Sequence, residues 1–291
     1  MVVSAITTLP APTRPGAVVD EGSWSVDDAF WDKVFPLLPP APSHERGGRP
    51  RSDDRAIFSA IFYILRTGIQ WRALPRGFGV APTTVHARFQ QWCADGLFAR
   101  LHAASLEAYD GAWGIDWLWL SVDGGMTKAP LGGEATGPNP TDRGKGGTKR
   151  SLVTDARGEV IGFAVAGANR NDHLLLSETL DALAAPRPEP TPQNPQNVCL
   201  DKGYDYQSSR DALAERGYTA HIRTRGEESR DLRTIPGYHP RRWVVERAHS
   251  WLNRFRRILV RWEKKAANYI AMVQLACAYH TFGTAAKAAP G

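Results

Sequence analysis

Apolar residues recur at helical spacing along the segment 240–262, PRRWVVERAHSWLNRFRRILVRW. They alternate in steps of four and three, as on one face of an amphipathic helix. This stripe consists of Val244, Ala248, Trp251, Phe255 and Ile258. The opposite face is centred on Glu246 and also carries the basic residues Arg242 and Arg257. The pattern therefore predicts one helix that presents a single carboxylate among cations on an exposed face.

The N-terminal third shows helical spacing over residues 24–38 and again over residues 52–67, where Gly68 provides the stop. A connector then leads to a helix that begins at Thr83 as its N-cap. Its exposed residues include His86 and Arg88. Helix, connector and helix are compatible with a helix-turn-helix in which these two residues contact DNA. A helical bundle without a nucleic-acid role fits the pattern equally well.

From Trp117 onwards, short apolar runs predict buried strands. The first run ends at Asp123, and the Gly/Pro-rich residues 124–147 predict a long loop. Further strands are predicted over residues 148–156, 159–168, 198–201 and 218–222. Helices are predicted over residues 172–185, 206–217 and 269–282. Arg157 and Gly158 form a turn, and residues 223–238 are expected to be a charged loop.

This order of elements predicts three regions. Residues 1–22 are rich in Pro, Ala and Thr and form a loose tail. Residues 23–112 form a helical, helix-turn-helix-like region, and residues 113–291 form an α/β region in which helices flank a mixed sheet. A Pro/Gln-rich linker, residues 186–197, interrupts the α/β region.

The charge of the chain favours a polyanionic partner. Its 36 Lys and Arg against 30 Asp and Glu give a net charge of +6, and the pI is near 9.3. Nine basic residues, against two acidic ones, fall between Arg241 and Lys265. So dense a basic strip attracts a phosphate backbone.

Cysteine spacing and hydropathy argue against several classes of protein. Cys93, Cys199 and Cys277 lie far apart without metal-ligand spacing, so a structural zinc or a disulfide framework is not expected. No apolar run approaches the roughly 18 residues of a membrane span, and the N-terminus lacks the apolar core of a signal peptide. We therefore expect a cytoplasmic protein without a membrane partner.

Three acids are candidates for metal chemistry. Asp123 and Asp201 each end a predicted strand, and reactive groups of open sheets gather outside the carboxyl ends of strands. If those strands are parallel neighbours, Glu246 can be brought over both acids by its helix. Carboxylate oxygens suit Mg²⁺ or Mn²⁺, and a pair of such ions stabilises the attacking and leaving oxygens of a phosphoryl displacement. For Glu246 alone, a surface ion pair with Arg242 is the simpler interpretation.

Other polar residues near these acids have structural interpretations. Asp155 lies in a turn, whereas Asp172 and Asp205 precede helices that they would cap. Tyr204 favours packing, and His173 is a secondary candidate near the metals. Basic residues that could hold a DNA backbone beside the acids are Lys128, Arg143, Lys145, Lys149, Lys202 and Arg242.

Together these motifs resemble the DDE transposases of bacterial insertion sequences, in particular the insertion sequence 5 family. The resemblance covers about residues 45–283 and is carried by TGPNPTDRGKGGTKRSLVTD with GANRND, LDKGYD, and RRWVVERAHSWLNRFRRILVRWE. It implies a ribonuclease-H-like catalytic domain and an N-terminal region that helps to bind terminal inverted repeats. It also implies a catalytic, metal-binding triad of Asp123, Asp201 and Glu246. The implied cofactor is Mg²⁺, as two ions for which Mn²⁺ can substitute.

The chain departs from the family's related tyrosine-arginine-glutamate-lysine signature at two positions. Arg242 and Glu246 match that signature, but His239 stands in the place of the tyrosine and Asn253 in the place of the lysine. Arg254 can substitute for the missing base, and with Arg257 it joins the expected DNA contacts. Only 44 residues separate Asp201 from Glu246, so the large β-rich insertion of some relatives is absent.

The resulting hypothesis is a transposase that cuts double-stranded DNA at the ends of an insertion sequence. It would then join the freed 3′-hydroxyl to target DNA, and we expect it to act as a homodimer. One rival is a DNA-binding regulator, which leaves the acids at strand ends unexplained. Another is a related nuclease or domesticated enzyme that cuts without joining.

Overall fold

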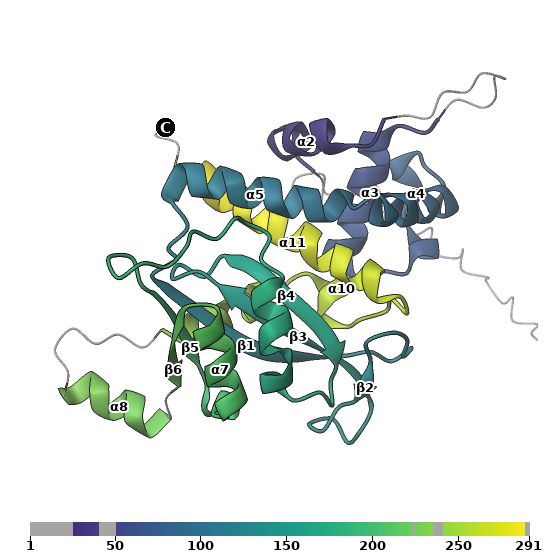
Figure 1. Cartoon of the computed structure of the whole chain (residues 1–291). Helices are drawn as coiled ribbons and strands as arrows, with labels where there is room; N and C mark the ends of the chain where they lie inside the picture. The colour runs from purple at the N-terminus through teal and green to yellow at the C-terminus, as the bar shows by residue number, and fades with distance from the viewer. Residues whose placement is uncertain (1–25, 41–50, 223–224, 235–240, 289–291) are drawn as a thin grey trace, which may run out of the picture.

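A computed structural model describes residues 26–40, 51–222, 225–234 and 241–288. The predicted tail over residues 1–22 lies outside the described residues. One mixed sheet carries helices on both faces, and the N-terminal helices form a further layer with the last helix (Figure 1). No helix in the described part is long and apolar enough to cross a bilayer.

The sheet begins as an antiparallel meander and continues with parallel strands. Its strands are β1 (Trp119–Lys128), β2 (Gly137–Pro138), β3 (Gly146–Thr154), β4 (Val160–Gly167), β5 (Gln196–Leu200) and β6 (Tyr218–Ile222). β3 pairs antiparallel with both β1 and β4, whereas β5 is parallel to β1 and to β6. The path β4-β3-β1-β5-β6 is that of a ribonuclease-H-like sheet, so the predicted fold class is confirmed.

The first strand is longer than the sequence predicted. β1 continues through Gly124 and Gly125 to Lys128, so Asp123 lies in mid-strand and does not end it. The strand persists because every residue from Ser121 to Lys128 is paired with β3. The predicted loop over residues 124–147 is wrong at both ends, since β1 and β3 enter it and β2 lies inside it.

The helical region contains α2 (Asp28–Val34), α3 (Asp54–Thr67), α4 (Pro82–Ala94) and α5 (Leu97–Trp113), with short 3-10 turns at Phe35–Leu37, Trp71–Ala73 and Arg76–Phe78. Asp53 caps α3 by accepting from the Ala56 amide at 2.7 Å, and Gly68 ends it in the left-handed conformation, as predicted. The predicted start of α4 is wrong, because Ala81 is its N-cap and no side chain caps it.

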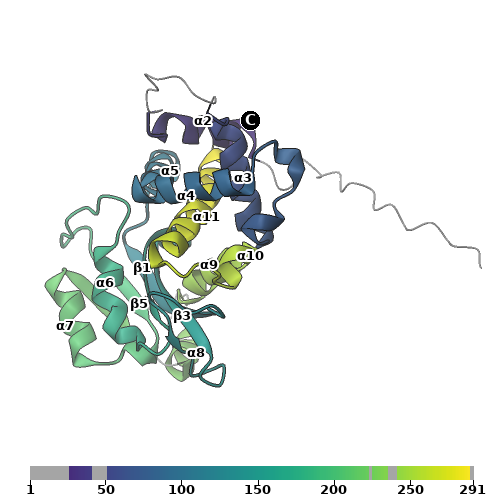
Figure 2. The same ribbon diagram turned by 90° about the vertical axis from the view of Figure 1, so that its right-hand side faces the viewer.

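Two hydrophobic cores lie on opposite faces of the sheet. One extends from α3 and α4 through α9 (Trp243–Leu252) and α11 (Ala266–Ala286) to β3 and β4. α11 packs along α5, as Figure 1 shows, so the last helix completes the N-terminal layer. The second core lies under α6 (Leu176–Asp181) and α7 (Gln207–Glu215), on the face away from α9 (Figure 2).

The long C-terminal amphipathic segment is broken, which corrects the prediction of one helix over residues 240–262. α9 ends at Leu252, and α10 (Arg256–Leu259) follows after a turn. As a result Arg257 is 4% exposed and not on an outer face. Its Nε lies 2.6 Å from Glu263 Oε1, and its Nη1 donates to the Ile69 carbonyl at 2.9 Å. Arg257 thus ties α10 to the connector that follows α3.

The predicted charged loop over residues 223–238 is also corrected, because it contains α8 (Arg225–Thr234). A run of charged residues gives no apolar stripe from which a helix could be recognised. The turn at Arg157 and Gly158, the strand over Tyr218–Ile222 and the apolar C-terminal helix agree with the sequence patterns.

We predict that removing one member of the buried ion pair destabilises the fold. Arg257→Ala leaves Glu263 charged at 5% exposure without its partner, and such a loss costs about 3–5 kcal/mol. The control is Arg210→Ala, which breaks an exposed pair with Asp205 and should cost less than about 1 kcal/mol. Urea unfolding measures both variants. Equal losses in the two variants would contradict a structural role for Arg257.

Candidate active site

The register between β1 and β5 brings two of the predicted acids together. Ser121 of β1 lies opposite Cys199 of β5 in a parallel ladder. Two residues further along, Asp123 and Asp201 come into line, just where β5 ends. The Asp201 side chain accepts from the Gly203 amide at 2.8 Å and opens the 3-10 turn Lys202–Tyr204. The prediction that the two strands are parallel neighbours is confirmed.

The Asp123 carboxyl is held in an environment that disfavours its charge. Burial, helped by the nearby carboxylates of Asp201 and Asp172, raises its pKa to about 6. A hydrogen bond from the Gly124 amide and the charge of Arg242 act in the opposite direction. Negative groups therefore crowd here, and a cation placed between them would relieve the repulsion.

Two glycines after Asp123 allow other side chains to approach the strand. A Cβ at Gly124 would lie 1.9 Å from Asp172 Oδ1, and a Cβ at Gly125 would lie 2.5 Å from His249 Nδ1. Neither position can carry a larger residue without displacing its neighbour. The Gly-Gly pair therefore allows other elements to pack closely against the strand, and it does not start a loop.

Glu246 lies on α9, a helix that packs against β1. Three residues later, His249 packs on β1, with its Nε2 3.3 Å from the Asp123 carbonyl and 4.0 Å from Asp123 Oδ2. Residues three apart share one face of a helix. The Glu246 side chain is 54% exposed, and its Oε1 lies 3.7 Å from Arg242 Nη2. Among the described residues no three His, Cys, Asp or Glu side chains form a metal-ligand group.

His249 and Asp172 are the neighbours that the sequence reasoning undervalued. Burial and the charge of Arg150 lower the pKa of His249 to about 4, so its imidazole is neutral at pH 7. Asp172 was interpreted as a helix cap, but no side chain caps that turn, and Asp172 pairs with Lys149 at 3.0 Å. The spacing of Glu246 and His249 on one helical face was the available signal.

Lys149 and two other predicted DNA contacts are engaged inside the protein. Lys149 is 5% exposed and bound to Asp172, and Arg257 is buried against Glu263. Arg88 forms an ion pair with Asp54 that joins α4 to α3. The expectation of exposed cations is wrong at these three positions, because carboxylates of the protein pair with them. The predicted DNA contacts that are exposed are Arg143, Lys145, Lys202, Arg254 and His86, whereas Arg242 is half-buried.

The secondary candidates have mostly structural roles. Asp155 is fully buried in its turn, where it accepts from the Arg157 and Glu159 amides at 3.0 Å. Asp205 caps no helix and pairs instead with Arg210 at 2.6 Å. His173 stacks on Tyr206, with 4.0 Å between ring centroids. Tyr204 is 1% exposed, in agreement with the packing interpretation.

Asn253 occupies the position where the signature would place a basic residue. Its Oδ1 accepts from Arg150 Nη2 at 2.8 Å, and Arg150 is 1% exposed on β3. The pair joins the end of α9 to the sheet. Asn253 therefore has a structural partner here, and the exposed side chain beside it is Arg254.

Two family models match the chain. "Putative transposase of IS4/5 family" matches residues 26–102, and "Transposase DDE domain" matches residues 119–280, more than half of the chain. The chain belongs to the DDE transposases. The predicted family and enzyme class, a metal-dependent DNA transposase, are thereby confirmed.

Relatives of this transposase come from insertion elements. It is 39% identical over 156 residues, 53% of this chain and 71% of the relative, to "Putative transposase for insertion sequence element IS402" of Burkholderia cepacia. It is 35% identical over 118 residues, 40% of this chain and 80% of the relative, to "Insertion element IS402 uncharacterized 16.2 kDa protein" of the same organism. The Mos1 strand transfer complex aligns over 84% of this chain and 81% of that chain, with 11% identity and a TM-score of 0.26.

We predict that Asp123→Asn stabilises the metal-free transposase at pH 7. The pKa of Asp123 is raised from 3.8 in the unfolded chain to about 6 in the fold, so the folded state loses stability as pH rises through this window. Allowing for partial exposure, the gain in unfolding free energy should be about 1–2 kcal/mol at pH 7 and should vanish near pH 4.

Chemical denaturation in EDTA at the two pH values measures this gain. Asp211→Asn, at an exposed carboxylate of α7, is the matched control and should change little. A loss of stability in Asp123→Asn at pH 7 would show that the carboxylate is not strained in the empty site.

Proposed function

We propose that this transposase cuts the phosphodiester bonds at the ends of its insertion sequence and joins the 3′-hydroxyl to target DNA. Asp123, Asp201 and Glu246 are the proposed catalytic residues, with Mg²⁺ as the cofactor, bound as two ions and replaceable by Mn²⁺. The observation that carries the proposal is the alignment of Asp123 with Asp201 across parallel strands, where their charges repel.

The chemistry of the donor set fits a hard divalent cation. Mg²⁺ is usually bound through one or two carboxylates together with waters and substrate phosphates. Asp123 and Asp201 provide two such carboxylates, and burial together with the nearby Asp201 and Asp172 carboxylates raises the pKa of Asp123. When bound, the ions would activate the attacking oxygen and stabilise the leaving oxygen of an in-line displacement.

The residues around the two acids position them. Asp123 is fixed by its pairing with Leu152 of β3, and the Asp201 side chain is fixed by the hydrogen bond that it accepts from the Gly203 amide. Neutral His249 fills the space over Gly125 without adding a positive charge. Both carboxylates are therefore held in place before any ligand binds, which lowers the reorganisation required for catalysis.

Glu246 needs only a local change to join them. Its position on α9 is one turn from His249, which already touches Asp123. The contact that holds it elsewhere is the exposed pair with Arg242, and such pairs contribute about 0.3–0.5 kcal/mol. A DNA phosphate that engages Arg242, together with a metal ion, would favour the released conformation of Glu246.

Terminal inverted repeats and target DNA are the proposed partners, bound by a homodimer in the cytoplasm. Arg143, Lys145 and Lys202 are exposed in segments that follow or adjoin the strands carrying the acids. The N-terminal helices present His86, whose ring meets the edge of Trp71 at 4.9 Å. The three cysteines are free, which suits a reducing compartment. A related enzyme that cuts without joining would share this site.

We predict that Asp123→Ala and Asp201→Ala each reduce metal-dependent cleavage of a terminal-repeat duplex by more than about a hundredfold. DNA affinity should remain, because neither carboxylate holds the backbone. Gel analysis of cleavage and of strand transfer into a plasmid measures both steps. Cleavage at the wild-type rate would refute the catalytic role, and cleavage without any transfer by the wild-type protein would favour the cutting-only enzyme.

We predict that Glu246→Gln lowers cleavage as strongly as loss of either aspartate, although Glu246 is the exposed one of the three proposed catalytic acids. Its folding should be unaffected, because among the described residues the side chain makes only the weak Arg242 contact. Glu227→Gln, at an exposed carboxylate of α8, serves as a control for charge. Thermal unfolding and cleavage are measured together. Normal cleavage by Glu246→Gln would show that the metal site takes its carboxylates from the two aspartates alone.

A further inference from the structure

A basic pocket lies apart from the acids. It is bounded by α9, the turn from β3 to β4 and the C-terminal ends of α5 and α11. Its volume is about 410 Å³. Four cations line it from separate parts of the chain: Arg157, Arg247, Arg254 and Lys287. Only Arg254 among them was expected to contact DNA. The single carboxylate in the lining is that of Glu159.

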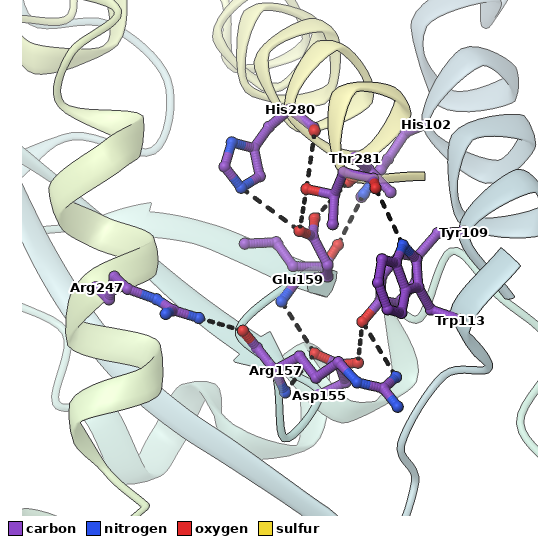
Figure 3. Close-up of polar contacts among 11 residues, drawn as sticks. His102, Tyr109, Trp113, Asp155, Arg157, Glu159, Arg247, His280 and Thr281 are labelled. Carbon is purple, nitrogen blue, oxygen red and sulfur yellow. Dashed lines mark hydrogen bonds and ion pairs between the residues drawn. The ribbon is translucent and has the colours of Figure 1, made fainter. Parts of the chain in front are cut away.

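The Glu159 carboxylate lines the pocket and is engaged by side chains of α11, as the dashed lines to His280 and Thr281 in Figure 3 show. It is 5% exposed and accepts from the hydroxyls of Thr281 and Thr284, each at 2.8 Å. His280 Nε2 lies 3.5 Å away on the same carboxylate. Its acceptor sites are therefore used by neutral donors of α11, and Arg247 and Lys287 act on it through their charges without a direct ion pair among the described residues.

The four cations form no ion pair with any carboxylate of the described residues. Three of the charges are nevertheless close together, since Lys287, Arg247 and Arg254 all act with burial to lower the pKa of His280 to about 4. Unpaired cations gathered at one place require counter-ions, and a polyanion supplies them with a gain from ion release.

The Arg247 side chain is held in place before any ligand binds. Its guanidinium lies over the ring of Trp243, 4.9 Å from the centroid, and one of its nitrogens donates to the Arg157 carbonyl. The exposed ring of Trp113 closes the pocket and is fixed by a 3.0 Å hydrogen bond to the Thr284 carbonyl. A preorganised arginine loses less conformational entropy when it binds an oxyanion.

We propose that this pocket binds a backbone phosphate of double-stranded DNA, at a position separate from the acid site. The proposal rests on the proposed function, which makes DNA the polyanion that the protein handles. Glu246 and Arg247 are neighbours on α9 and point about 100° apart. The helix can therefore present a carboxylate to the metal site on one side and a cation to the duplex on the other. Binding of this kind is independent of base sequence.

The test is the double variant Arg247→Gln/Lys287→Gln. Its affinity is measured against NaCl concentration for a terminal-repeat duplex and for an unrelated duplex of equal length. Both duplexes should bind more weakly by the same factor, and the slope of log K against log salt should fall by about 0.9 for each phosphate that is no longer neutralised. The control is Lys33→Gln/Arg210→Gln, which removes two exposed charges elsewhere and should keep the slope.

Arg247→Lys keeps the charge and should retain most of the affinity, and thermal unfolding of each variant checks the fold. An unchanged slope in the double variant, an equal decrease in the control, or a decrease confined to the terminal repeat would each overturn the proposal. Metal-dependent cleavage by the wild type is assayed in parallel. If the wild type does not cut DNA while the double variant binds DNA more weakly, the proposed cleavage activity is refuted and the proposed phosphate-binding pocket is supported.

Discussion

The parallel pairing of β1 with β5 is the constraint on which the site depends. Asp123 and Asp201 are 78 positions apart in the chain, yet the ladder leaves them in line. Pairing with β3 fixes the Asp123 backbone, and the Gly203 amide holds the Asp201 side chain just beyond the end of β5. Burial and the nearby Asp201 carboxylate raise the pKa of Asp123. The hydrophobic cores on the two faces, through Leu152 on one side and Val122 on the other, hold the sheet that imposes this arrangement.

α9 is held by packing on one face. Its apolar stripe packs on the sheet and α11, and the Ser121 hydroxyl donates to the Arg241 carbonyl at 3.1 Å. Beyond it, Arg257 and Arg261 anchor the chain, and Arg261 donates to the Thr148 hydroxyl at 2.7 Å. The position of Glu246 along the helix is thus determined by packing. Within the described part of the chain, its carboxylate pairs with Arg242 at 3.7 Å.

Most of the fold could be predicted from periodicity, because apolar stripes and alternating runs report which face is buried. The two aspartates could also be predicted, since each follows an apolar run. The extension of β1 could not, because Gly124 and Gly125 have the composition of a loop. Glycine is needed at both positions because Asp172 and His249 approach the strand closely, from elements more than 40 residues away. A sequence pattern carries no sign of such a long-range fit.

The basic strip between Arg241 and Lys265 shows why charge alone is a poor guide to DNA contacts. Arg257 and Arg261 are 4% and 1% exposed and bind groups of the protein itself. Arg241 lies over the ring of Trp119, 4.5 Å from its centroid. Arg247 and Arg254, in contrast, are exposed beside a pocket and lack a carboxylate partner among the described residues. A cation whose charge is already paired gains little from a phosphate, whereas an unpaired one gains the full interaction. The pairing of each residue, and not the density of the strip, therefore identifies where a duplex would bind.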